Sequence, residues 1–172
     1  MTTKSTAAFI IVLLMSSTAF AQFEWEKLAY YHSTGNTTPD VQSSYQIELH
    51  ESGNSKLEYT KYGRTNIYEF TPSSSGLRKI DRMINSSGVL DADTADLRGT
   101  GEFKPGPVYL LTIFLDKPTG YKKRKHPSVI IQTEVDKKYR EKAFRIYEEM
   151  ESVVPPEIWA KAYEDAQKNS GK

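Results

Sequence analysis

The sequence predicts an α+β fold in which helices pack on an antiparallel sheet of about five or six strands. Some segments alternate apolar and polar residues, as strands do, and others repeat apolar residues every three or four positions, as helices do. Tight turns separate neighbouring strand segments, which requires antiparallel pairing. The predicted order is βββ-α-ββ-α-α, and we expect residues 22–172 to form a single domain.

The strand predictions begin with a three-stranded meander over residues 44–71. Apolar Tyr45, Ile47 and Leu49 alternate with polar residues, and turns are expected at residues 51–54 and 63–66. Residues 25–32 have the aromatic content of another strand but alternate weakly. Residues 108–115 are apolar on both faces, which predicts a central strand covered on both sides. Residues 129–133 are its expected hairpin partner.

The helix predictions rest on apolar spacing and on end signals. A helix near residues 75–86 is expected to be capped by the serines at 73–75 and to end at Gly88. Two more are expected near 137–151 and 157–167, separated by Pro155 and Pro156. Residues 91–107 contain three glycines and two prolines, so we expect an irregular loop whose acidic residues cap short turns. The predicted core comprises Tyr45, Ile47, Leu49, Leu77, Ile80, Leu111, Ile113, Ile130, Ile146 and Trp159.

Residues 1–21 have the pattern of a signal peptide. Lys4 precedes an apolar run over residues 7–15, and Ala19 and Ala21 are the small residues that signal peptidase requires, so cleavage is expected before Gln22. The apolar run is too short to span a membrane as a helix. We expect export to the periplasm or the extracellular space and no integral membrane segment after cleavage. The alternatives are an uncleaved anchor and a buried core helix.

The absence of cysteine limits both anchoring and cross-linking. A lipoprotein needs a cysteine directly after the cleavage site, so the protein is not lipid-anchored by that route. An exported domain without disulfides is more typical of bacteria than of eukaryotes.

The balanced charge and the missing catalytic motifs make several classes of function less favoured. Lys and Arg number 23 and Asp and Glu 22, which gives no reason to expect a specific nucleic-acid partner. The sequence contains no Gly-x-Ser-x-Gly elbow, phosphate-binding glycine loop or His-Glu-x-x-His motif. Its three histidines, His32, His50 and His126, stand far apart. We therefore expect neither a metal nor a cofactor.

One run of residues concentrates positive charge at the predicted hairpin tip between residues 108–115 and 129–133. We interpret it as a tip kept soluble and unpaired by charge. The alternative is a weak, salt-sensitive contact with a polyanion or an anionic membrane surface, with one aromatic ring for stacking. The candidate binding residues are Tyr121, Lys122, Lys123, Arg124, Lys125 and His126.

Tyrosine is abundant, with eleven in the chain. Tyr59, Tyr62 and Tyr68 lie on the meander and would form an exposed aromatic face if helices leave that side of the sheet uncovered. Such a face favours contact with a protein or a sugar, because tyrosine offers a large contact area at small entropic cost. The alternative is that these rings belong to the core.

These observations predict an exported bacterial protein that acts as a non-enzymatic binding or protein-interaction module, with a protein or carbohydrate partner. A small secreted hydrolase using a carboxylate with His50 or His126 is the first alternative. A polyanion-binding surface protein is the second.

Overall fold

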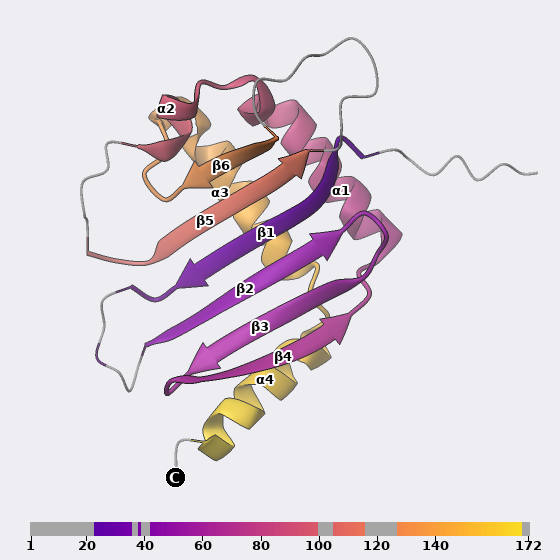
Figure 1. Cartoon of the computed structure of the whole chain (residues 1–172), viewed down its shortest axis with the longest axis vertical. Coiled ribbons are helices and arrows are strands. Elements are labelled where there is room, and N and C mark those ends of the chain that lie inside the picture. Colours follow the sequence, from indigo (N-terminus) through magenta and orange to yellow (C-terminus); the bar gives the residue numbers. More distant parts are fainter. Residues whose placement is uncertain (1–22, 36–37, 39–41, 100–104, 116–126, 170–172) are drawn as a thin grey trace, which may run out of the picture.

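The computed structural model describes residues 23–35, 38, 42–99, 105–115 and 127–169. These residues form one antiparallel sheet of six strands in the order β4-β3-β2-β1-β5-β6 (Figure 1). The strands are β1 (Trp25–Ser33), β2 (Ser43–His50), β3 (Ser55–Lys61), β4 (Arg64–Phe70), β5 (Val108–Leu115) and β6 (Ser128–Gln132). The helices are α1 (Ser74–Ser87), the 3-10 turn η1 (Val89–Asp91), α2 (Thr94–Arg98), α3 (Lys137–Ser152) and α4 (Pro156–Asn169).

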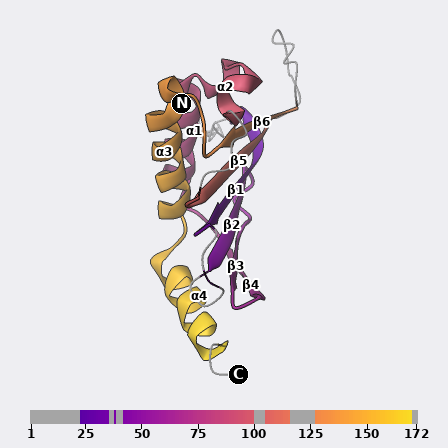
Figure 2. The ribbon, with the colours of Figure 1, turned by 90° about the vertical axis from the view of Figure 1, so that its left-hand side faces the viewer.

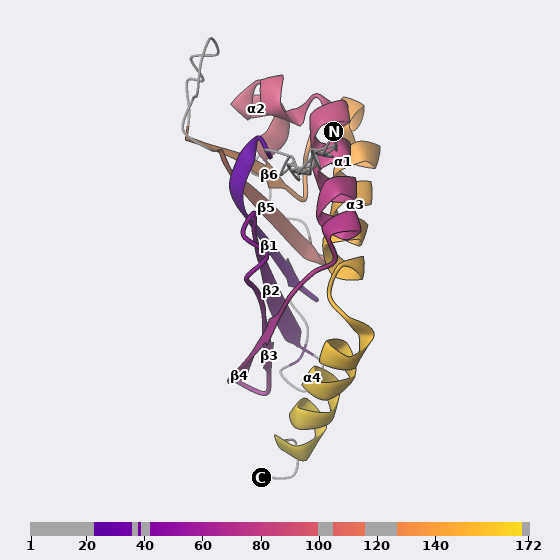
Figure 3. The same cartoon turned by 90° about the vertical axis from the view of Figure 1, so that its right-hand side faces the viewer.

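Helices α1, α3 and α4 all lie on the same face of the sheet, as Figures 2 and 3 show from opposite sides. The short α2 lies at the edge of the sheet beside β6. This two-layer arrangement confirms the predicted α+β fold with an antiparallel sheet. Successive side chains of a strand point to opposite faces, so Ile47 and Leu49 are buried beneath the helices and Gln46 and Glu48 point away from them.

The meander of β2, β3 and β4 is confirmed, but its second turn is tighter than expected. β3 ends at Lys61 and pairs directly with Arg64, so the turn consists of Tyr62 and Gly63 alone. Both residues have positive φ, 52° and 72°, as the primed hairpin turns require. The expected turn at residues 63–66 was therefore wrong, and β4 already begins at Arg64.

The end signals of α1 are confirmed. The Ser73 hydroxyl accepts a hydrogen bond of 3.1 Å from the Gly76 amide, and Gly88 ends the helix at a φ of 79°.

The irregular loop expected over residues 91–107 instead contains the short helix α2. Asp93 caps it by accepting a hydrogen bond from the Ala95 amide at 3.1 Å, which is the capping role expected of these acidic residues.

The strand over residues 108–115, which was expected to be central, is not at the centre of the sheet. The weakly alternating β1 lies between β2 and β5, whereas β5 is one strand from the edge. In β5 only Leu111 and Ile113 are buried, and Leu110 and Phe114 on the other face stay half-buried. The expectation of a strand covered on both sides was wrong because none of the described helices lies on that second face.

The core lies between the sheet and α1, α3 and α4. Seven of the ten predicted core residues are buried there: Ile47, Leu49, Leu77, Ile80, Leu111, Ile113 and Ile146. Tyr45 and Trp159 are half-buried against this core. Ile130 pairs with Thr112 on the opposite face, and Ile131, which pairs with Leu111, is buried instead. A shift of one residue moves a strand side chain to the other face, and β6 is too short for its pattern to fix that choice.

Candidate functional site on the uncovered face of the sheet

The sheet face that points away from α1, α3 and α4 is the main candidate site, and we call it the uncovered face. The strand register places the side chains of two groups of residues on it. The polar group is Lys27, Gln46, Glu48, His50, Lys56, Glu58 and Glu69. The apolar group is Tyr31, Ile67, Val108, Leu110, Phe114 and Ile130.

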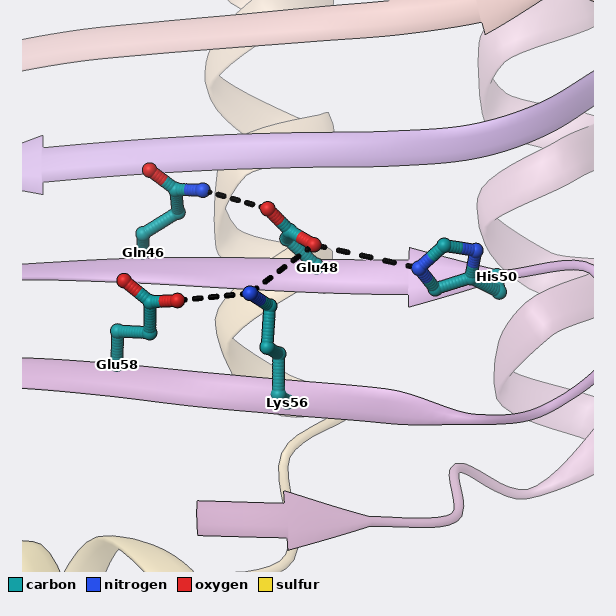
Figure 4. Close-up of polar contacts among 5 residues, drawn as sticks. All are labelled: Gln46, Glu48, His50, Lys56 and Glu58. Atoms are coloured by element: carbon teal, nitrogen blue, oxygen red, sulfur yellow. Dashed lines mark hydrogen bonds and ion pairs between the residues drawn. The ribbon is translucent and has the colours of Figure 1, made fainter. Parts of the chain in front are cut away.

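An ordered polar network occupies the middle of this face on β2 and β3 (Figure 4). The Gln46 amide donates to one oxygen of Glu48 at 2.8 Å. The Lys56 ammonium lies 3.4 Å from the other Glu48 oxygen and donates to Glu58 at 2.8 Å. Lys56 therefore bridges two carboxylates on neighbouring strands. Glu48 and Lys56 are direct cross-strand neighbours, so the hairpin register itself brings them together.

Partial burial makes this network more than an ordinary surface ion pair. The Glu48 side chain is only 14% exposed, although no described helix lies over it. The hydrogen bond to Glu58, together with the charge of Glu48, raises the pKa of Lys56 above its usual value. The network thus presents charges in fixed positions, which suits recognition of a partner.

Replacing Lys56 by Met should leave two neighbouring carboxylates without their cation. We expect the free energy of unfolding to fall by about 1–3 kcal/mol at neutral pH, the usual cost of an unpaired, partly buried acceptor. Because the folded-state pKa of Lys56 is raised, its contribution is complete below the unfolded pKa of about 10.4 and is lost as the pH rises through the folded value. The deficit of the variant should therefore shrink at strongly alkaline pH.

Denaturant unfolding of Lys56→Met and of the control Lys137→Met, an exposed lysine at the start of α3, measures this effect. The control should unfold like the wild type. A Lys56→Met variant as stable as the control at neutral pH would show that the network contributes nothing to folding.

His50 lies at the end of the network but is not tightly joined to it. Its Nε2 atom is 4.0 Å from the Glu48 carboxylate, which is longer than a hydrogen bond. The pairing of a carboxylate with His50, expected for the hydrolase alternative, is therefore loose in this structure. Glu48 is instead bonded to Gln46 and lies within ion-pair distance of Lys56.

A hollow of about 490 Å³ opens beside His50, where the β2–β3 turn meets the end of β4. Six of its seven lining side chains carry hydrogen-bonding groups, and the seventh is Phe70. The lining residues are His50, Asn54, Ser55, Lys56, Glu69, Phe70 and Thr71. The hollow shares His50 and Lys56 with the network, so the two form one continuous polar region.

The other half of the uncovered face is mostly apolar. Tyr31 and Leu110 are neighbours across β1 and β5, and Phe114 and Ile130 lie further along the same face. All four are half-buried. The Lys27 ammonium lies 4.4 Å from the centre of the Phe114 ring, a cation–π contact that joins the apolar half to the polar half.

The predicted aromatic face is not exposed at two of its three residues. Tyr59 and Tyr68 point toward the helices and are buried beneath α4, where Tyr59 contacts Tyr163 and the Tyr68 hydroxyl donates to Asp165 at 2.9 Å. Burial and then this hydrogen bond raise the pKa of Tyr68 to about 12. Tyr62 is 38% exposed because it forms the β3–β4 turn. The alternative interpretation as core residues therefore holds for Tyr59 and Tyr68.

The basic-run candidates, Tyr121, Lys122, Lys123, Arg124, Lys125 and His126, lie outside the described residues. The expected signal peptide over residues 1–21 and its cleavage site before Gln22 also lie outside the described residues. These interpretations remain predictions from the sequence.

A second cluster, which the sequence did not reveal, joins the sheet to the end of α3. One carboxylate oxygen of Glu151 accepts hydrogen bonds from Tyr30 and Tyr45, each at 2.7 Å. Burial and then these bonds raise the pKa of both hydroxyls. Beside them the His32 ring packs between Tyr45 and Tyr109, and burial lowers its pKa. The cluster lies on the helix-covered side, where it holds α3 against β1 and β2.

Comparison with protein families and curated proteins gives no assignment for this chain. No protein-family model matches the chain, and no curated protein matches it either. Among the described residues, no group of three or more His, Asp or Glu side chains is placed to hold a metal ion. Nor is any helix in the described ranges long and apolar enough to cross a membrane.

Proposed function

We propose that this is an exported binding protein that contacts a folded protein partner through the uncovered face of its sheet. The observation that supports the proposal is the one-sided coverage of the sheet: the face opposite α1, α3 and α4 combines a fixed charge network with half-buried apolar side chains. Apolar and aromatic side chains that lie beside ordered polar groups are typical of a protein interface.

The size and shape of the face favour a protein over a small ligand. Strands lie about 4.8 Å apart and rise about 3.3 Å per residue, so the face measures roughly 25 Å in each direction, or about 600–700 Å². This is close to the roughly 800 Å² that each partner contributes to a standard protein interface. An open sheet face of this area suits a folded surface.

Site-specific photo-crosslinking in the native host tests this proposal. A photoreactive residue in place of Tyr31 or Leu110 should yield one discrete adduct with another protein. The matched control replaces Glu148, which is exposed on α3 of the opposite layer, and should yield none. An adduct with a second copy of this chain would replace the proposal by self-association. No adduct from the uncovered face, or the same adduct from Glu148, would contradict it.

Export is the part of the proposal that rests on the sequence alone. We expect the mature protein recovered from the host to begin at Gln22, because Ala19 and Ala21 occupy the small-residue positions before it. Mass spectrometry of the purified protein measures this end. Material that retains residues 1–21 would show that the segment is not a cleaved signal.

A second function is favoured only by the basic run at residues 122–126. Polyanion binding would make retention on heparin strongly salt-dependent, because binding displaces counterions. We expect instead that a variant with Lys122, Lys123, Arg124 and Lys125 replaced by Ser elutes with the wild type and unfolds like it. Earlier elution of the variant would assign the run to polyanion binding.

A further inference from the structure

The hollow beside His50 has the volume of a small-molecule site but not the usual lining. Ligand pockets commonly measure about 300–1,000 Å³ and are mostly apolar. This one measures about 490 Å³, and six of its seven lining residues carry side-chain hydrogen-bonding groups. Its ligand should therefore be small and rich in polar groups.

The charges around the hollow disfavour an anionic ligand. The only certain cation in the lining is Lys56, and its ammonium is already engaged by Glu58 at 2.8 Å and Glu48 at 3.4 Å. Glu69 adds an exposed carboxylate to the same lining. A phosphate or carboxylate would meet more negative than positive charge here, so a neutral ligand fits better.

The remaining lining groups complement hydroxyl groups. The Asn54 amide and the Thr71 hydroxyl each donate and accept hydrogen bonds, and the Glu69 carboxylate accepts them. Phe70, the one apolar residue of the lining, is only 8% exposed and belongs to the core. We infer that the hollow binds one unit of a neutral saccharide, a ligand of suitable size that presents several hydroxyl groups. This inference is independent of the protein partner proposed above.

Nuclear magnetic resonance titration of the purified protein tests the inference directly. Glucose and N-acetylglucosamine serve as probes, and sodium phosphate serves as the anionic comparison. At least one sugar should produce saturable shifts confined to the backbone amides of residues 50–56 and 69–71. Phosphate should produce none there.

Matched variants separate binding from folding. Asn54→Ala combined with Glu69→Gln should weaken sugar binding by at least tenfold without changing the folded spectrum, since both side chains are exposed. Glu148→Gln on α3 should leave binding unchanged. The absence of saturable shifts with either sugar, shifts elsewhere on the protein, or binding of phosphate alone would overturn the inference. The photo-crosslinking result does not bear on it.

Discussion

Leu111→Ala should lower the free energy of unfolding by about 2–5 kcal/mol, whereas Leu110→Ala should lower it by less than about 1 kcal/mol. The two residues are adjacent in β5 and identical in type. Leu111 is fully buried beneath the helices, and Leu110 lies half-buried on the uncovered face. Truncation at Leu111 leaves a cavity in a packed core, while truncation at Leu110 removes a side chain that water already reaches.

Urea unfolding monitored by circular dichroism measures both values. The neighbouring strand offers an independent repeat of the comparison, because Ile131 is fully buried and Ile130 points to the uncovered face. Ile131→Ala should therefore cost much more than Ile130→Ala. Equal costs within either pair would mean that both faces of the sheet are packed.

Glu151→Leu should destabilise the protein by about 2–4 kcal/mol, because the hydroxyls of Tyr30 and Tyr45 lose their shared acceptor. Each buried hydroxyl left without a partner costs about 1–3 kcal/mol, and Tyr30 is fully buried. Glu151→Gln keeps an acceptor oxygen in the same place and should cost less.

The control for this prediction is Glu148→Leu, which changes an exposed glutamate of the same helix. It should unfold within about 0.5 kcal/mol of the wild type, as surface substitutions do. Near-ultraviolet circular dichroism provides a second readout, since the aromatic rings around Glu151 should lose their fixed arrangement in Glu151→Leu but not in Glu148→Leu. A Glu151→Leu variant as stable as the control would show that the Glu151 cluster does not stabilise the fold.

Most of the fold follows from signals within about ten residues along the chain. The serine cap at Ser73, the end of α1 at Gly88 and the alternation through Ile47 and Leu49 are all local. The prediction that failed concerns which faces of the sheet the helices cover. The pattern of β5 predicts burial on both sides, although the described helices cover only one of them.

Part of the candidate site could have been predicted from the sequence. Glu48 and Lys56 are nearly symmetric about the predicted turn at residues 51–54, so the hairpin register could have paired them. The Glu151 cluster could not be found in this way. Tyr30 and Glu151 stand 121 positions apart, and no local pattern links a strand residue to the end of a distant helix.

Oxidative footprinting in intact host cells, compared with the purified protein, tests most directly whether the uncovered face is the contact surface. Tyr31 and Phe114 report on that face, and Tyr163, which is 49% exposed on α4, reports on the helix layer. We expect Tyr31 and Phe114 to be protected in cells and Tyr163 to react equally in both samples. Unchanged reactivity of Tyr31 and Phe114, with protection of Tyr163 instead, would place the contact on the helix layer and contradict the account.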